Sequence, residues 1–527
     1  MKFFHKKSIR KIAGVAAITP MLWAASSCTG HFDEMNTSPT QIMTLSQAEL
    51  PKVFSRALSY GSYHPNYQTA TNLFADLWCQ FFATTTPNFQ SDRYHTNMGW
   101  IGSHWNPIYT QVVPQLMTIF ESYDPQSAEH ALANVWWVFS FHRVTDYYGP
   151  IPYLDAGIPA RSVKYDAQDV IYDDFFKRLA AAVEILKTKR SETPYGTSDI
   201  IYQGNVDKWI KFANTLRLRL ALRISMVDPQ RARTEAEAAV ASGVMESSAD
   251  DAMMVRTATS SADANGISRI AAWGEFRMSA TMESILKGYN DPRMTEFFQP
   301  AFNTGTYEGL RNGLSPAQLT EPLHTNDANS NVGARWVRNT GTGSGWENIF
   351  AVPANIMHAA EAYFLRAEGA LNGWNMGGNA KDFYEQGIRE SMATWGFTGA
   401  AVEEYIQGTT PPIAPGDGLN SPPVSDIPVK WAATEDKQRE QIGTQKWLAV
   451  YPDGCEGWAE YRRTLYPKLY PVVNSVNEDV QPPAHIRRFP FITAEKNTNG
   501  AAVEEAVKLL KNGEDKASTP LWWDVNP

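Results

Sequence analysis

The sequence is poor in cysteine, has no excess of basic residues and has no long apolar segment after residue 25. Its 527 residues include 3 Cys, and 47 Lys and Arg stand against 56 Asp and Glu. Nucleic-acid binding depends on clustered positive charge, so this acidic balance argues against a nucleic-acid partner. A membrane-spanning helix needs about 20 successive apolar residues, and no segment beyond the N-terminus offers them.

Cysteine and histidine are too sparse to indicate a disulfide framework or a metal centre. After Cys28 only Cys79 and Cys455 follow, and their spacing fits no zinc site. The two could pair in an oxidising compartment, but we expect two buried thiols. His95 and His104 are the nearest histidine pair in a loop region, and we expect no metal there. The sequence therefore predicts neither a metal nor a cofactor.

Motifs of several enzyme classes are missing. The sequence has no His-Glu-x-x-His, no Gly-Lys-Ser/Thr loop and no Cys-x-x-Cys. The glycines of residues 341–345 lack a preceding strand and a following helix, so we interpret this segment as a flexible loop. Neighbouring acids such as Asp173 and Asp174 could imitate a glycosidase pair, but that chemistry needs carboxylates about 5–10 Å apart across a bond. We predict a protein that is not an enzyme, with a surface glycoside hydrolase as the alternative.

The first 28 residues have the pattern of a secretory signal peptide followed by a lipidated cysteine. Residues 2–11 are basic, residues 12–25 are mostly apolar, and the small residues Ala25, Ser26 and Ser27 precede Cys28. A cysteine at this position is similar to that of the bacterial lipobox. We predict a signal peptide over residues 1–27 and a membrane anchor of acyl chains on Cys28. Cleavage leaves 42 basic against 56 acidic residues, a formal net charge of −14.

We predict that residues 28–527 form a single domain. No Ser/Gly linker or block of like charge divides them. The Pro-rich residues 409–428 lie between helical patterns, so we interpret them as a long surface loop of that domain.

Apolar residues recur at helical spacing through much of the chain, which predicts a mainly α-helical fold. In residues 207–226, Trp209, Ala213 and Leu216 share one face, and Asp207 is placed to cap the helix start. Residues 355–372 end at Asn372-Gly373, a pair typical of a left-handed helix end. Further helices are predicted over residues 46–60, 66–83, 127–147, 167–187, 381–395 and 429–450.

Residues 355–372 and 380–395 look like a helical hairpin joined by the Gly-rich turn 373–378. Ala380, Tyr384 and Gly387 give the small–aromatic–small pattern that resembles the second helix of a tetratricopeptide repeat. No 34-residue self-similarity is visible, so any repeats are divergent.

Several segments, in order along the chain, resemble the SusD/RagB family of outer-membrane lipoproteins. Any one of them would be a weak signal, but the ordered set is specific. The segments are residues 32–39 (FDEMNTSP), 143–153 (RVTDYYGPIPY), 202–219 (from YQGN to LRLR), 291–293 (DPR), 361–368 (EAYFLRAE) and the tail from 487–490 (RRFP) to 522–524 (WWD).

The resemblance implies a SusD-like fold with four divergent tetratricopeptide-type helical hairpins and a loop-rich ligand-binding region. It implies a lipoprotein of the outer membrane, exposed at the cell surface, that binds an oligosaccharide and delivers it to a SusC-type TonB-dependent transporter. A peptide-binding role like that of RagB is the alternative. Most motif residues, including Trp209 and Asn214, are expected to support the fold rather than touch the ligand.

The candidate ligand site comes from aromatic residues within polar loops. Three stretches rich in Gly, Asn, Ser and Thr, residues 84–102, 246–274 and 302–346, interrupt the helices, and connections this long are usually functional. An aromatic ring can cover the apolar face of a sugar while polar side chains bind its hydroxyls. Trp105 opens a helical pattern and is expected to pack in the core. The predicted ligand-binding residues are Asp92, Tyr94, Trp100, Trp336, Arg338 and Trp346.

Overall fold

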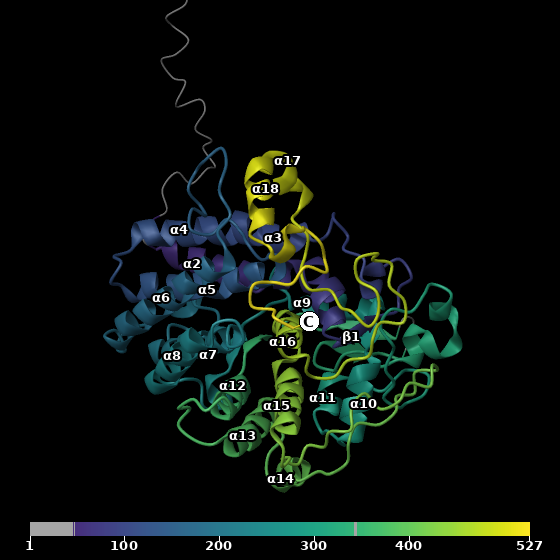
Figure 1. Ribbon diagram of the computed structural model, residues 1–527. Helices are drawn as coiled ribbons and strands as arrows, with labels where there is room; N and C mark the ends of the chain where they lie inside the picture. Colours follow the sequence, from purple (N-terminus) through teal and green to yellow (C-terminus); the bar gives the residue numbers. More distant parts are fainter. Residues whose placement is uncertain (1–45, 47, 342–344, 527) are drawn as a thin grey trace, which may run out of the picture. The chain divides into compact units, whose positions relative to one another are not determined.

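The computed structural model describes residues 46, 48–341 and 345–526 (Figure 1). The predicted signal peptide and the lipidation site at Cys28 lie outside the described residues. The chain divides into two compact units, Met1–Leu50 and Pro51–Pro527, and the fold below is that of the second. Within the described residues, no helix has the length and apolar character needed to cross a membrane.

Helices dominate this unit, as the sequence predicts, and short irregular helices join some of them. The predicted helices over 127–147, 167–187 and 207–226 are confirmed within a few residues at each end. The helices of the first half are α2 (Leu50–Gly61), α3 (Gly102–Pro107), α4 (Val113–Ser122), α5 (Ala128–Tyr148), α6 (Gln168–Lys187), α7 (Val206–Arg223) and α8 (Pro229–Ser242).

The second half contains shorter helices and then the predicted hairpin. Gly373, just past α12, has a φ of 76°, so the predicted left-handed helix end is confirmed. The helices are α9 (Gly266–Ile270), α10 (Ala280–Gly288), α11 (Met294–Phe297), α12 (Ala359–Leu371), α13 (Ala380–Thr394), α14 (Ala400–Ile406), α15 (Glu435–Val450), α16 (Gly454–Thr464), α17 (Thr493–Thr498) and α18 (Gly500–Lys508).

Consecutive helices pack in pairs and the pairs pack on one another. Helix α5 contacts α6, α7 contacts α8, α12 contacts α13, and α15 contacts α16. Helix α7 also contacts α12, and α12 contacts α15, so the pairs form a continuous helical layer (Figure 1). The tetratricopeptide character of these pairs stays a prediction.

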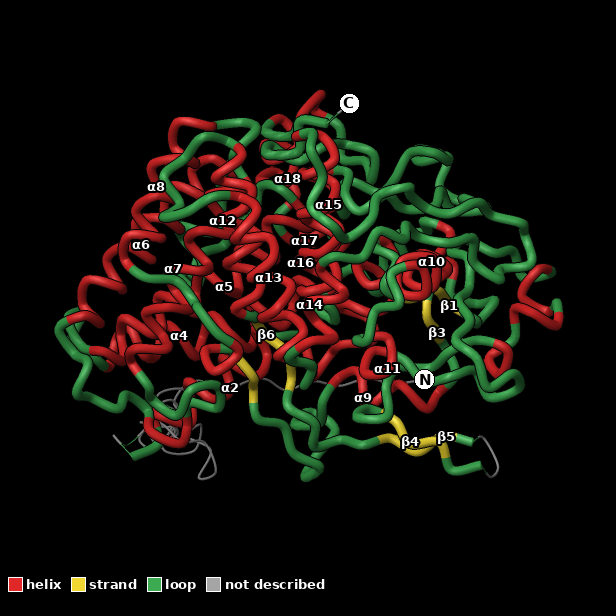
Figure 2. The backbone as a smooth tube through the Cα atoms, turned by 90° about the horizontal axis from the view of Figure 1, so that it is seen from below, coloured by secondary structure: helices red, strands yellow, loops and turns green. Residues whose placement is uncertain are grey.

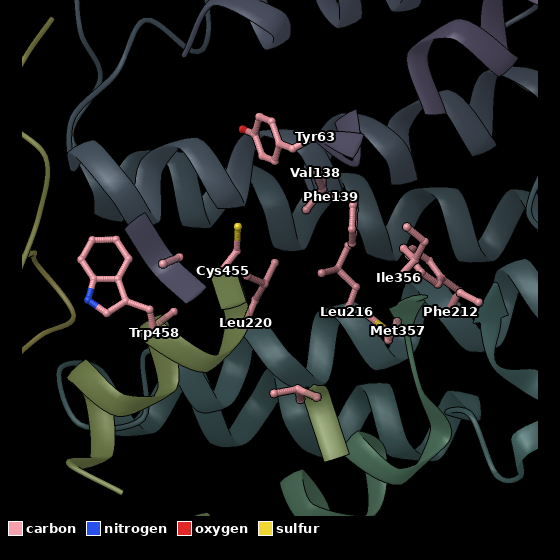
Figure 3. Packing of buried hydrophobic residues seen from close by; sticks show 14 of the residues in the cluster. Tyr63, Val138, Phe139, Phe212, Leu216, Leu220, Ile356, Met357, Cys455 and Trp458 are labelled. Atoms are coloured by element: carbon pink, nitrogen blue, oxygen red, sulfur yellow. The ribbon is translucent and has the colours of Figure 1, made fainter. Parts of the chain in front are cut away.

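The hydrophobic core lies between these helices. Figure 3 shows Leu216 and Leu220 of α7, Ile356, and Cys455 of α16 among its members. Burying a leucine contributes about 1.5–3 kcal/mol to stability. Both Cys455 and Cys79 are buried free thiols, as expected, and burial raises the pKa of Cys455 to about 12.

Three predicted helices begin or end elsewhere because other contacts compete for their residues. Helix α7 is capped by Asn205, whose side chain accepts the Lys208 backbone N–H, so Asp207 is not the cap. Residues 355–357 form a strand rather than the first turn of α12. The helix predicted from 429 begins at Glu435, because the backbone carbonyl of Val429 accepts the hydroxyl of Tyr384 instead.

The described residues form three small antiparallel sheets, two of which join distant parts of the chain while the third is a local hairpin (Figure 2). The helix predicted over 66–83 is instead a π-helical segment, Gln68–Asp76, followed by a turn and a strand, because residues 82–84 pair with a later strand. The pairs are β1 (Phe82–Thr84) with β3 (Phe276–Met278), β2 (Ala252–Met254) with β6 (Ala354–Met357), and β4 (Val337–Asn339) with β5 (Trp346–Asn348).

Residues of the family motifs form buried polar contacts inside the helical layer. The Trp209 indole donates to Asp199 at 2.7 Å, and the Asn214 amide donates to the carbonyl of Gly243 at 2.8 Å. Arg219 of α7 makes a bidentate ion pair with Glu361 of α12 at 2.7 and 2.6 Å. These contacts agree with the expectation that the motif residues support the fold.

The ion pairs continue into a network that joins α7, α12, α15 and α16. Arg223 contacts Glu456 at 2.6 Å and Glu460 at 2.8 Å. Arg463 contacts Glu368 at 2.6 Å and Glu460 at 2.7 Å. All of these charges except the partly exposed Glu368 are buried, so they depend on their partners to offset the loss of water.

Candidate ligand-binding site

The three loop-rich stretches meet around strand β3. Strand β1, which leads into the first stretch, pairs with β3 directly, with Phe82 opposite Met278. The third stretch lies on the other edge, where the backbone of Met278 donates to Ser330 at 2.9 Å and accepts from Leu310 at 2.8 Å. Trp273 and Gly274, at the end of the second stretch, are separated from β3 by Glu275 alone. The fold therefore brings together loops that are far apart in the sequence.

A cavity of about 420 Å³ opens at the second stretch. Two of its aromatic side chains are exposed to solvent, Trp273 by 51% and Phe350 by 38%. Hydroxyl, amide and guanidinium groups complete the wall. The remaining lining residues are Ala258, Thr259, Ser260, Ser261, Ala264, Arg269 and Asn348.

The backbone around Trp273 is held firmly although its indole is exposed. The Asn348 side chain accepts the backbone N–H of Ala272 at 2.8 Å and donates to the carbonyl of Arg269 at 3.0 Å. Gly274 follows with a φ of 73°, a left-handed conformation that glycine adopts without strain. Asn348 of β5 thus fixes the segment that presents the indole.

Phe350 is attached to the same frame through Asn265. The Asn265 side chain caps α9 by accepting the N–H groups of Ile267 and Ser268, while its own backbone N–H donates to the carbonyl of Phe350 at 2.9 Å. The Asn265 amide also donates to the carbonyl of Val352 at 3.2 Å. The two exposed rings therefore stand on backbones that are tied to one another.

The polar groups of the cavity are positioned by short-range contacts. Arg269 donates to the carbonyls of Pro65 at 2.8 Å and Ser261 at 3.1 Å, and burial lowers its pKa, although an arginine remains charged at neutral pH. The Ser260 hydroxyl donates to Asp263 at 2.6 Å. These contacts leave acceptor capacity on the Ser260 hydroxyl and donors on the Arg269 guanidinium for a ligand.

Two of the predicted ligand-binding residues, Trp336 and Trp346, are buried in the hydrophobic core. Trp336 has no exposed surface, and its ring meets Trp395 at a centroid distance of 5.9 Å. Trp346 is also buried, with the Arg277 guanidinium 6.0 Å from its ring. Both indoles belong to the hydrophobic core, because the chain from Trp336 through β5 turns them inward. Any ligand contact by these residues stays a prediction.

The predicted residue Arg338 lies on the outer side of the same hairpin. Its side chain is exposed and stands 3.4 Å from the carboxylate of Glu347, opposite it in β5. The structure thus separates Arg338 from the buried rings of Trp336 and Trp346.

Asp92, in the first stretch, is buried as a link between loops. Its carboxylate accepts from the Asn312 amide at 2.6 Å and from the backbone N–H groups of Gly313 at 3.1 Å and Thr84 at 3.3 Å. Burial raises its pKa to about 6, although these hydrogen bonds oppose the rise. Asp92 therefore ties the first stretch to the third.

The aromatic residues near Asp92 differ in exposure. Tyr94 is buried, with a φ of 64°. Trp100 is partly exposed and meets Phe89 edge to face at 5.6 Å. Trp105 is buried in α3, which confirms its expected place in the core. Of the predicted tryptophans, Trp100 keeps the most accessible ring.

Trp273 and Phe350 are absent from the predicted set. Trp273 lies in the stretch 246–274, which the sequence singles out by its polar composition alone. The signal that could have found it is the pair Trp273-Gly274, a large ring followed by a residue suited to a sharp turn. Phe350 lies two residues after Asn348, close to the predicted residue Trp346. The sequence alone does not show whether the ring of Phe350 is exposed.

Among the described residues, no group of three or more His, Cys, Asp and Glu could hold a metal ion. The ring of His104 is buried and lies 3.5 Å from that of Tyr147. Burial lowers the pKa of His104 to about 3.

Comparison with known proteins gives consistent matches. The family model described as SusD-like, Susd and RagB outer membrane lipoprotein, matches residues 33–524. A chitin-binding SusD homolog from Flavobacterium johnsoniae is 35% identical, with 89% of this chain and 99% of that chain covered and a TM-score of 0.78. A SusD-like protein from Bacteroides thetaiotaomicron is 33% identical over 90% and 99%, with a TM-score of 0.79. A SusD homolog from Bacteroides uniformis is 32% identical over 92% and 100%, with a TM-score of 0.79. A comparison with curated proteins gives no match.

Proposed function

We propose that this chain, which belongs to the SusD-like family of outer membrane lipoproteins, binds an oligosaccharide at the cavity of Trp273 and Phe350. Delivery of that oligosaccharide to a SusC-type TonB-dependent transporter completes the proposed role. The site is defined by Trp273, Phe350, Arg269, Asn348 and Ser260.

The observation that carries the proposal is an exposed indole on a fixed backbone beside a cavity with polar walls. Exposing 51% of a tryptophan side chain is unfavourable in water. A sugar ring would cover the indole with its C–H face and present its hydroxyls to Ser260 and Arg269. Asn348 uses its amide to hold the backbone, so its role at the site is positioning.

Ligands containing N-acetylglucosamine are the first to test. The Flavobacterium johnsoniae homolog is described as chitin-binding, and so is a second solved structure at 26% identity. The N-acetyl group adds an apolar methyl and an amide, which suit a second ring such as Phe350 and hydroxyl partners such as Ser260. A peptide remains the alternative ligand.

Binding is favoured over hydrolysis at this cavity. A glycosidase needs a pair of carboxylates facing the scissile bond. The described residues that line the cavity include no Asp or Glu. We therefore propose capture without cleavage.

The experiment is calorimetric titration of the protein, without residues 1–27, with chitohexaose. We expect Trp273→Ala to weaken binding tenfold or more, since ring stacking contributes about 0.5–1.5 kcal/mol beyond the area that it buries. Leu323→Ala, which removes another exposed apolar side chain away from the cavity, is the matched control. Trp100→Ala tests the site predicted from sequence.

Three results would count against this proposal. One is unchanged affinity of Trp273→Ala for every glycan that the parent binds. Another is a loss caused by Trp100→Ala alone, which would move the site to the first loop stretch. The third is cleavage of the glycan during the titration, detected by chromatography.

Anchoring and delivery are tested in cells. Cys28→Ala is expected to shift the protein from the membrane fraction to a soluble one, because acyl chains supply the attachment. Protease treatment of intact cells tests exposure at the surface. Affinity purification from mildly solubilised membranes is expected to recover a SusC-type barrel, and its consistent absence would contradict the delivery role.

A further inference from the structure

A second cavity, of about 460 Å³, lies between the C-terminal ends of α12 and α16 and the middle of α15. It shares no lining residue with the cavity of Trp273. Its volume is in the range typical of small-molecule sites, about 300–1,000 Å³. We propose that it binds a neutral saccharide of one or two rings, whether or not the Trp273 cavity binds a glycan.

Two aromatic residues that line this cavity, Trp374 and Tyr466, each pack closely against a glycine inside a helix. Trp374 follows α12, and a Cβ added at Gly369 of that helix would lie 3.3 Å from its ring and 2.7 Å from the sulfur of Met376. A Cβ added at Gly443 of α15 would lie 2.4 Å from the Cβ of Tyr466. Glycine weakens a helix interior, so two helices give up stability where these walls approach them.

The helices that supply the walls lie against each other. Helix α12 packs on α15 and α15 packs on α16 (Figure 1). Ile442 of α15 and Met226, beyond the end of α7, add apolar surface to the cavity. The cavity therefore offers ring faces and aliphatic groups to the apolar side of a sugar.

The floor of the cavity is charged but balanced. Arg463 donates two hydrogen bonds to Glu368, both of 2.6 Å, and two to Glu460, of 2.7 and 3.1 Å. Lys446 lies 3.0 Å from Glu460. Arg439, which also lines the cavity, pairs with Glu435 at 2.7 Å. The three cations and their acidic partners Glu368, Glu460 and Glu435 therefore cancel in formal charge. A charged ligand would disturb the balance, whereas a neutral ligand would not.

One donor in the floor lacks a hydrogen-bond partner. The side chain of Lys446 is only 3% exposed, and its ammonium lies 3.0 Å from Glu460 and 3.5 Å from Glu456. Neither ion pair has the alignment of a hydrogen bond, and Nζ has no hydrogen-bond partner among the described residues. Buried donors are nearly always satisfied. Nζ is covered by its neighbours, so a sugar hydroxyl accepts from it once the Lys446 side chain turns toward the cavity that it lines. The same hydroxyl can donate to a carboxylate.

The test uses the Trp273→Ala variant, so that the first cavity contributes little. Maltose and N,N′-diacetylchitobiose are titrated into this variant while tryptophan fluorescence and heat are followed. We expect at least one of them to saturate a single site and change the fluorescence. Adding Trp374→Ala is expected to weaken that binding about tenfold, whereas Trp374→Phe, which keeps a ring, should stay within about threefold.

Lys446→Met provides a second test because it removes the donor and keeps the length of the side chain. We expect it to abolish the binding, and the Trp374 variants carry the test if Lys446→Met does not fold. Glucuronic acid and glucosamine serve as charged probes and should bind more weakly than glucose.

Any of three outcomes overturns the proposal. The first is that neither neutral disaccharide saturates a site. The second is that Trp374→Ala leaves the affinity unchanged, and the third is that a charged probe binds more tightly than glucose. Failure of the Trp273 cavity is distinguishable, because it is judged by chitohexaose binding to the parent protein and the single Trp273→Ala variant.

Discussion

The buried network around Arg219 and the cavity around Trp273 use polar residues in opposite ways. In the network, Arg219 and Glu361 satisfy each other without water and hold α7 against α12. At the cavity, Asn348 and Asn265 satisfy only the backbone, and the groups that face solvent keep free capacity. The motifs that identify the family fall on the first region, and the proposed ligand site falls outside them. If the proposed site is right, the residues that identify the family are different from those that bind the ligand.

The largest loss of stability is expected when the ion pair between Arg219 and Glu361 is broken. Glu361→Ala leaves the Arg219 guanidinium buried without its main partner, which typically costs about 3–5 kcal/mol of stability. Chemical denaturation of the variant measures it. The double variant Arg219→Met, Glu361→Leu removes both charges and should recover most of that loss. Equal losses in the single and double variants would show that packing, not charge, holds the helices.

The next largest difference is expected between the stability losses caused by replacing a buried and an exposed tryptophan. Trp336→Ala is expected to reduce the free energy of unfolding by about 3–5 kcal/mol, as for other core tryptophans. Trp273→Ala should change it by less than about 1 kcal/mol, because half of that side chain already faces water. Thermal melting compares the two. A large loss of stability in Trp273→Ala would mean that its indole serves packing.

A buried acid should make stability depend on pH. Burial raises the pKa of Asp76 from its ordinary value of 3.8 to about 7. The folded state therefore binds a proton that the unfolded state has released between these values. Stability should fall as pH rises from about 4 to about 7, by at most about 1.4 kcal/mol per pH unit from this group.

The Asp76→Asn variant tests that assignment. The Asn carbonyl can still accept the Tyr67 hydroxyl, which lies 2.5 Å from the carboxylate. Denaturation at several pH values should give a flatter profile for the variant than for the parent. An unchanged slope would assign the pH dependence to other groups.

The smallest expected effect concerns the start of α7. Asn205→Ala should destabilise the protein by about 1 kcal/mol, because it removes the side chain that accepts the Lys208 N–H. Asp207→Ala, at the position predicted from sequence, should cost less. The reverse order in chemical denaturation would restore Asp207 as the cap.

The helical scaffold could be predicted from sequence because its signals are local. Apolar residues at helical spacing in residues 127–147 and 207–226 predict helices, and α5 and α7 form there with most of their residues buried. The family resemblance, read from ordered motifs, is confirmed by the match over residues 33–524. The π-helical segment and strand at 68–84 were not foreseen, since β1 exists only through pairing with β3, nearly 200 residues later.

The candidate site was only partly predictable for the same reason. The sequence identifies polar loops, but the exposure of a ring depends on which way a hairpin folds. Trp336 and Trp273 both follow polar stretches, and only the contacts with Trp395 and Asn348 decide that one is buried and the other presented. No local pattern contains that information.

The central claim is that a glycan stacks on the Trp273 indole at the cavity of the second loop stretch. A crystal structure of the protein soaked with chitohexaose tests it most directly. We expect a sugar ring stacked on the Trp273 indole, with hydroxyls within hydrogen-bond distance of Ser260 or Arg269. A glycan bound elsewhere, with the Trp273 indole still facing solvent, would contradict the account.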